Sequence, residues 1–206
     1  MTPETDREYY QAIFLETATQ YYVAGRFAAI HHLFPVSGNL LHHAVEMYLK
    51  GVLANNYTLR EMFTSFRHDL TKLWDEFKKI FTGSDLSQFD SVIENLNRFD
   101  RIRYPDKLVA EGMTGQFARF RNDFINSASD NNPTTPAYNL VLEEIDDLVK
   151  VIFQCSKLNP LFCFQALSDE ARRFLLLHNA HSFPQASNPI PEVAERISGS
   201  SSTDYI

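Results

Sequence analysis

Two charged residues lie four positions apart in the otherwise apolar segment Leu40 to Ala54, which reads L-L-H-H-A-V-E-M-Y-L-K-G-V-L-A. On a helix, Glu46 and Lys50 would form an ion pair in the favourable order, with the acid nearer the N-terminus. Because an unpaired charge is costly to bury, each group must meet a partner or reach solvent. Three interpretations stay open: a polar pocket inside a helical bundle, a structural ion pair, or a lysine that extends to solvent.

His68 and Asp69 form a second candidate group, in His68-Asp69-Leu70 at the start of another amphipathic segment. An aspartate at a helix start accepts hydrogen bonds from the first backbone amides and complements the helix dipole. Capping alone therefore explains Asp69. It does not explain His68, which is either an ordinary exposed histidine or a ligand contact.

A third candidate group lies in Arg103-Tyr104-Pro105-Asp106. Pro105 ends the preceding helix and makes Tyr104 extended, which turns Arg103 and Tyr104 toward whatever lies at the helix end. The planar guanidinium of arginine binds phosphate or carboxylate groups through two parallel hydrogen bonds. We favour such an anion site over the alternative, a solvated last turn whose basic residues complement the helix dipole.

Two histidine pairs, His31-His32 and His42-His43, raise the question of a metal site. Neighbouring residues on a helix point apart, so such a pair does not readily chelate one ion. His43 and Glu46 are three residues apart and could share a metal, but no ligand pair is evident on another helix. We therefore expect no metal and no cofactor.

The elements that position these groups should be helices, because apolar residues recur at three- and four-residue steps along most of the chain. The expected helices run from Pro3 to near Pro35, from Leu40 to Leu53, from Leu59 to Phe66, from His68 to Phe81, from Phe89 to before Pro105, from Tyr138 to Leu158 and from Leu161 to His178. Ser37 or Asn39 is the expected N-cap of the second helix. No segment shows the two-residue alternation of a strand.

The segment after Lys107 is harder to interpret. Gly112 and Gly115 interrupt it, although Phe117, Phe120 and Phe124 have helical or near-helical spacing. The end of the chain is rich in proline and serine and poor in apolar residues, which is typical of disorder. We expect one helical domain over residues 1–180 and a poorly ordered tail over 181–206.

Composition excludes several classes of function. The chain has 206 residues, 44% of them hydrophobic, which is enough for one sizeable core. A net charge of −7 argues against non-specific nucleic-acid binding through a basic surface. Cys155 and Cys163 are expected to be free thiols. The N-terminus lacks a signal-peptide pattern and no apolar run could span a bilayer, so we expect a cytoplasmic protein with no membrane contact.

The order of the three groups, a helix with Glu46 and Lys50, then H-D-L, then R-Y-P-D, resembles the HEPN family of small helical domains. The resemblance rests on about Leu40 to Asp106. It implies an all-α up-down bundle of about five to seven helices that often dimerises. It also implies a shared polar pocket, with Glu46, Lys50, His68, Asp69, Arg103 and Tyr104 as the candidate ligand-binding residues.

Catalytic HEPN proteins are metal-independent ribonucleases with a late R-x(4–6)-H motif, usually R-N-x-x-x-H. In that motif the arginine steadies phosphate charge and the histidine handles protons. Here Arg121-Asn122 has no histidine at the required distance, and Arg26 to His31 lies in the first helix, the wrong place. Arg173 and His178 have the right spacing without the asparagine, so they are the alternative catalytic pair.

Three functional hypotheses follow. The first is a non-catalytic or degenerate HEPN-like module that binds a nucleotide, RNA or a protein partner. The resemblance suggests a toxin–antitoxin or defence setting, with a nucleotidyltransferase as partner. The second is a metal-independent ribonuclease toxin, and the third is a helical scaffold without a ligand.

Overall fold

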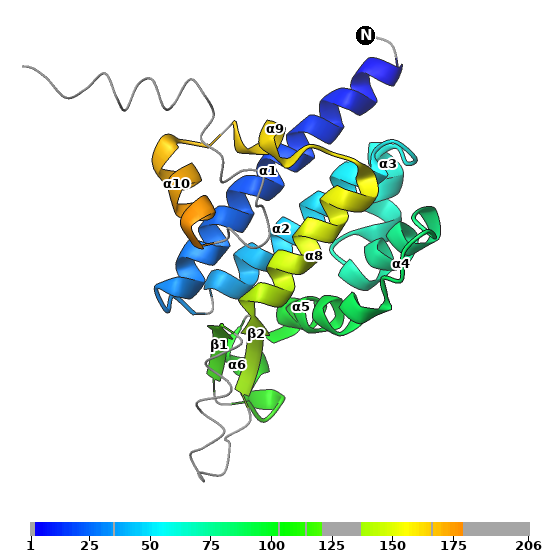
Figure 1. Ribbon diagram of the computed structural model, residues 1–206. Coiled ribbons are helices and arrows are strands. Elements are labelled where there is room, and N and C mark those ends of the chain that lie inside the picture. Colours follow the sequence, from blue (N-terminus) through cyan, green and yellow to red (C-terminus); the bar gives the residue numbers. More distant parts are fainter. Residues whose placement is uncertain are drawn as a thin grey trace, which may run out of the picture.

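The computed structural model describes residues 3–34, 36–102, 104–113, 115–120, 137–165 and 167–178. The fold is an all-α bundle, as the sequence predicted, built around two long helices, α1 (Pro3–Ile30) and α2 (Val36–Leu53) (Figure 1). They pack closely along their length. A Cβ at Gly25 of α1 would lie 2.9 Å from Cγ of Leu41 in α2, so only glycine permits this approach.

The start of α2 differs from the expectation. The helix begins at Val36, so Ser37 and Asn39 lie in its first turn and neither is the N-cap. The Ser37 amide donates to the Leu33 carbonyl at 3.1 Å, so the backbone itself provides an acceptor there. Helix α2 is central in the bundle, since most of its side chains are buried, including the charged ones.

Three further helices pack against α2 and bury their apolar stripes: α4 (Leu70–Ile80), α5 (Asp90–Ile102) and α8 (Leu142–Ser156). A short 3₁₀ turn, η2 (Ser87–Phe89), precedes α5. Trp74 and Phe77 of α4 stack with ring centroids 5.2 Å apart. Helix α8 is joined to α1 by a buried ion pair between Arg26 and Asp146, to which Tyr22 also donates a hydrogen bond.

The link from α2 to α4 contains the expected short helix, in two parts. Helix α3 (Leu59–Glu61) starts with a capping box, in which the Glu61 amide donates to Thr58 Oγ1 at 3.3 Å and the Thr58 amide donates to Glu61 Oε2 at 2.8 Å. A π-helix, η1 (Met62–Phe66), follows directly. π-helical segments are rare in proteins, and those that occur are often found at functional sites.

The sequence missed two short strands. After α6 (Pro105–Ala110), strand β1 (Gly115–Arg119) pairs in parallel with β2 (Ala137–Val141), with Gly115 opposite Ala137. The helical interpretation of Phe117 was therefore wrong, and the helix expected from Tyr138 begins only at Leu142. Tyr138 and Leu140 are buried while Asn139 and Val141 are half-buried, which is the alternation of a strand. This alternating segment is too short to be recognised in the sequence.

The C-terminal helical region also differs. The single helix expected over Leu161 to His178 is two helices, α9 (Pro160–Phe164) and α10 (Asp169–His178). The Asn159 side chain caps α9 by accepting from the Leu161 amide at 3.0 Å. Both cysteines are free thiols, as expected. The predicted tail, 181–206, lies outside the described residues.

Candidate functional site

The predicted polar centre lies on the face of α2 that carries Glu46. Its carboxylate is fully buried and accepts hydrogen bonds from Lys50 Nζ at 2.5 Å, from His43 Nδ1 at 3.2 Å and from His68 Nδ1 at 3.0 Å. Three of the residues that the sequence singled out, Glu46, Lys50 and His68, therefore meet. We call the five residues His42, His43, Glu46, Lys50 and His68 the Glu46 cluster.

Lys50 does not extend to solvent. Its ammonium group is fully buried and donates to Glu46 Oε1 and, at 2.6 Å, to the backbone carbonyl of Arg67. It also lies 5.2 Å from the ring centroid of Phe63, within the range of a cation–π contact. The interpretation of a lysine that reaches water is therefore wrong, and the buried ion pair is satisfied by groups from two segments.

The turn between η1 and α4 brings His68 to this pair. Arg67 follows the π-helix with φ +50° and ψ −115°, a strained conformation for a non-glycine residue. That conformation presents the Arg67 carbonyl to Lys50. The next side chain, His68, then reaches Glu46 from outside the helix. The strain is local, and the hydrogen bond from a buried ammonium group offsets it.

His43 and His68 are the accessible members of the cluster. Their side chains are 25% and 64% exposed, and their ring centroids lie 6.2 Å apart. Because each donates through Nδ1 to the carboxylate, the second nitrogen, Nε2, is the one left for other contacts. Tyr21 of α1 lies beside His43 with ring centroids 5.6 Å apart, and Phe63 is 55% exposed. The cluster thus carries aromatic rings at its rim.

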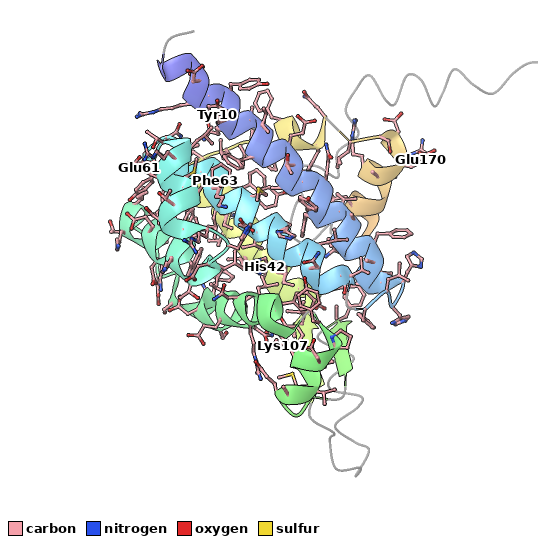
Figure 2. All side chains as sticks on the ribbon, turned by 180° about the vertical axis from the view of Figure 1, so that it is seen from behind. Tyr10, His42, Glu61, Phe63, Lys107 and Glu170 are labelled. Atoms are coloured by element: carbon pink, nitrogen blue, oxygen red, sulfur yellow. The ribbon has the colours of Figure 1, made fainter. Side chains whose placement is uncertain are left out.

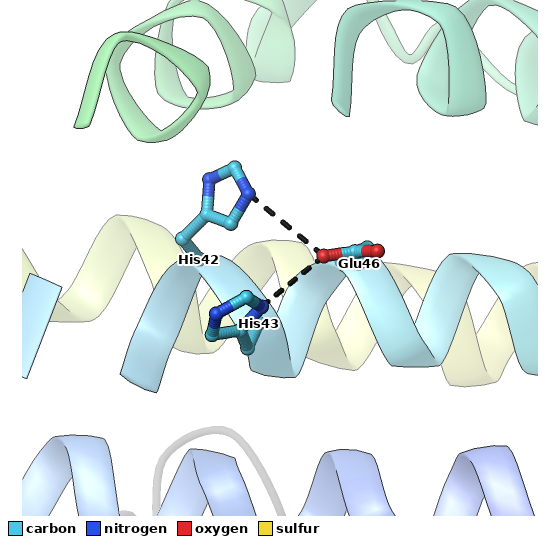
Figure 3. Close-up of side chains that lie close together, drawn as sticks. All are labelled: His42, His43 and Glu46. Carbon is cyan, nitrogen blue, oxygen red and sulfur yellow. Dashed lines mark hydrogen bonds and ion pairs between the residues drawn. The ribbon is translucent and has the colours of Figure 1, made fainter. Parts of the chain in front are cut away.

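His42 reaches the same carboxylate from the buried side. Its Nδ1 lies 2.9 Å from the Leu96 carbonyl of α5, and its Nε2 lies 3.9 Å from Glu46 Oε2. Figure 2 places His42 where α2 faces α5, and Phe63 on the neighbouring α3–η1 segment. His42, His43 and Glu46 offer three ligand atoms within 4.8 Å of one another. Although His42 and His43 are adjacent and leave the helix in different directions, both approach the same Glu46 oxygen, Oε2 (Figure 3).

The electrostatics of the cluster favour an ionised Glu46. Burial by itself raises the pKa of this carboxyl. Hydrogen bonds from His43 and Lys50, the charge of Lys50 and the hydrogen bond from His68 outweigh burial and lower the pKa from 4.5 to about 2. The carboxylate therefore stays charged at neutral pH, and the buried pair with Lys50 is neutral overall.

The other predicted ligand contacts do not join the cluster within the part of the chain that the structure describes. Asp69 caps α4, where its carboxylate accepts from the Thr71 amide at 3.1 Å and the Lys72 amide at 3.2 Å. Tyr104 is exposed at the start of α6. Arg103 lies outside the described residues, so the anion site predicted there stays a prediction.

The alternative catalytic pair is only partly described. Helix α10 contains both positions, and the Arg173 side chain is exposed on it, while the side chain of His178 lies outside the described set. The Arg121-Asn122 remnant also lies outside it. Arg26 is buried in an ion pair with Asp146, whereas His31 is exposed just after the end of α1. The two residues therefore have different surroundings, and Arg26 has a structural role.

A surface hollow of about 390 Å³ lies away from the cluster, between α5 and α8. Its lining is mostly polar, with the side chains of Gln88, Ser91, Glu144, Asp147, Lys150 and Gln154. Ligand pockets are usually apolar with a few convergent polar groups. The hollow lacks that character, so the Glu46 cluster remains the candidate functional site.

Comparisons with known proteins add no assignment. No family model, curated protein or solved structure matches the chain. The resemblance to HEPN domains therefore stays a prediction from the sequence. Within the described residues, no helix combines the length and apolar character that crossing a membrane requires.

Proposed function

We propose that the chain is a HEPN-like, non-catalytic helical module of the cytoplasm that binds a nucleotide, free or at the end of a short RNA, at the Glu46 cluster. The observation that carries the proposal is the meeting of two separate segments, α2 and the turn after η1, at one buried carboxylate, with Phe63 and His68 exposed at its rim. A nucleobase stacks on such rings, and the imidazoles offer hydrogen bonds to its edge.

Charge favours a small ligand over a long polymer. The ammonium group of Lys50 is already committed to Glu46 and to the Arg67 carbonyl, so it is not free to hold a phosphate. The chain as a whole carries −7, which gives a polyanion little non-specific attraction. Binding should therefore depend on stacking and hydrogen bonding, and weakly on salt.

Equilibrium titration with mononucleotides and short single-stranded RNA tests this function. Removing one stacking ring costs about 1–3 kcal/mol, so Phe63→Ala should weaken binding by about 5- to 150-fold. Phe162→Ala is the matched control, because Phe162 is 72% exposed on α9, away from the cluster. Absence of nucleotide binding, or equal effects of both substitutions, would overturn the proposal. A protein partner would then be the alternative ligand.

A metal-independent ribonuclease is the second candidate, favoured by one observation. His43 and His68 are two imidazoles held by one carboxylate, and one unprotonated and one protonated imidazole could serve as general base and general acid. Cleavage of RNA in a chelator-containing buffer, abolished by His68→Ala and kept by His31→Ala, would make this the function.

A further inference from the structure

The three ligand atoms on α2 have the spacing of a metal coordination shell. Glu46 Oε2 lies 3.2 Å from His43 Nδ1 and 3.9 Å from His42 Nε2, and all three atoms lie within 4.8 Å of one another (Figure 3). In a tetrahedral zinc site with bonds of about 2.0–2.1 Å, neighbouring ligand atoms are about 3.3 Å apart. The separations from Glu46 are close to that value, and the two imidazole nitrogens must approach each other by up to about 1.5 Å to surround one ion.

The surroundings of His42 hold its ring as metal-binding histidines are held. A carbonyl oxygen only accepts, so Nδ1 of His42 donates its proton to the Leu96 carbonyl at 2.9 Å. The other nitrogen, Nε2, lies 3.9 Å from Glu46 Oε2 and is the atom available as a ligand. A metal-binding histidine almost always donates its other N–H to a carbonyl or a carboxylate in this way.

The two oxygens of the Glu46 carboxylate have different partners. Lys50 donates to Oε1, whereas His42 and His43 both approach Oε2. An ion at Oε2 would replace the proton that His43 Nδ1 shares with the carboxylate, and that proton would move to the exposed Nε2. His68 Nδ1 lies 3.2 Å from the same oxygen and is mostly exposed, so it can turn to become the fourth ligand.

We propose that His42, His43 and Glu46 bind one divalent transition-metal ion of the zinc class, with His68 or water in the fourth position. Two or three imidazoles favour zinc, copper, nickel or cobalt over magnesium and calcium, which prefer oxygen ligands. The positive charge of Lys50 next to Oε1 limits the affinity of the site. Removal of that charge should therefore strengthen metal binding, which a purely structural hydrogen-bond network would not do.

Cobalt(II) is a suitable probe, because its visible absorption is intense in a tetrahedral site and weak in water. The full chain, without a polyhistidine tag and stripped with a chelator, is titrated with Co²⁺. Zn²⁺ is then added as a competitor, and Mg²⁺ serves as the control ion that should not displace Co²⁺. We expect one tetrahedral Co²⁺ per chain. His43→Gln keeps a hydrogen-bond donor beside Glu46 but removes the ligand, and should weaken binding at least about tenfold.

The second histidine pair supplies the matched control. His31 and His32 are exposed, adjacent and outside the cluster, so His31→Ala with His32→Ala should bind Co²⁺ like the native chain. Lys50→Met should bind it more tightly, once circular dichroism shows that the variant folds. Absence of tetrahedral Co²⁺, or equal losses in both histidine pairs, would overturn the metal site. Nucleotide binding is measured with chelator present, so either proposal can fail without the other.

Discussion

Replacement of Glu46 by glutamine is expected to remove about 3 kcal/mol of folding stability at neutral pH. The substitution keeps the shape of the side chain but leaves the fully buried Lys50 ammonium group with neutral acceptors only. The pKa of Glu46 is about 2 in the folded protein against 4.5 ordinarily, a difference equivalent to about 3 kcal/mol. Breaking one partner of a buried ion pair costs about 3–5 kcal/mol, so the two estimates agree.

Acid should remove the same contribution from the native chain. Because the folded pKa of Glu46 lies below its unfolded value, its stabilisation is complete above about pH 4.5 and is lost as pH falls toward about 2. The native chain and Glu46→Gln should therefore converge in acid. Urea unfolding followed by circular dichroism, in metal-free buffer between neutral and acid pH, measures the gap. A gap of less than about 1 kcal/mol at pH 7, or one that does not shrink in acid, refutes the reasoning.

The pairing itself is tested by a double-mutant cycle. Lys50→Met alone leaves the buried carboxylate without its ammonium partner, whereas Glu46→Gln with Lys50→Met removes both charges. The double variant should therefore lose less stability than the sum of the two single variants. Lys79→Met is the control, because Lys79 pairs with Glu76 at 2.8 Å on the surface and its removal should leave stability nearly unchanged.

Other predictions concern packing, activity and assembly. Gly38→Ala should destabilise the fold by about 1–3 kcal/mol in thermal unfolding, because a Cβ would lie 2.4 Å from Phe99 Cε2 in the core, whereas Gly83→Ala, which meets open space, should be neutral. Purified chain should cleave RNA little or not at all without divalent metal; robust cleavage that His178→Ala abolishes would establish the ribonuclease hypothesis. Light scattering at tens of micromolar should give a homodimer, since exposed aromatic residues such as Tyr9 favour interfaces; a strict monomer contradicts this.

The sequence predicted the helical bundle and half of the site, because both depend on local spacing. Apolar periodicity located α2, and a separation of four residues was enough to pair Glu46 with Lys50. The approach of His68 was suggested only by the family resemblance. Its cause is the π-helix and the positive φ of Arg67, and neither has a sequence signature that distinguishes it from an ordinary helix end.

The meeting of His42 and His43 at Glu46 was not predicted, for a different reason. The sequence argument compared the directions of His42 and His43 at the backbone, where adjacent residues do diverge. An imidazole extends well beyond its Cβ, however, and both rings turn toward the carboxylate of Glu46, one from the α5 side and one from the exposed side. The useful signal was the separation of each histidine from Glu46, four and three residues, and not their separation from each other.

A structural ion pair explains Glu46 and Lys50 but does not explain the imidazoles around them. One ammonium group already neutralises the carboxylate, and the Arg67 carbonyl satisfies a further ammonium proton. Three histidines from two segments nevertheless gather at that carboxylate, His43 and His68 are partly exposed there, and the Phe63 ring lies 5.2 Å from Lys50 Nζ. Hydrogen bonds from His43 and His68 stabilise the charged carboxylate further, beyond the one ammonium group that pairs with it. Their convergence is what a ligand site requires. The two candidate ligands depend on different groups: a nucleotide would stack on the exposed ring of Phe63, and a metal ion would bind the buried nitrogen of His42.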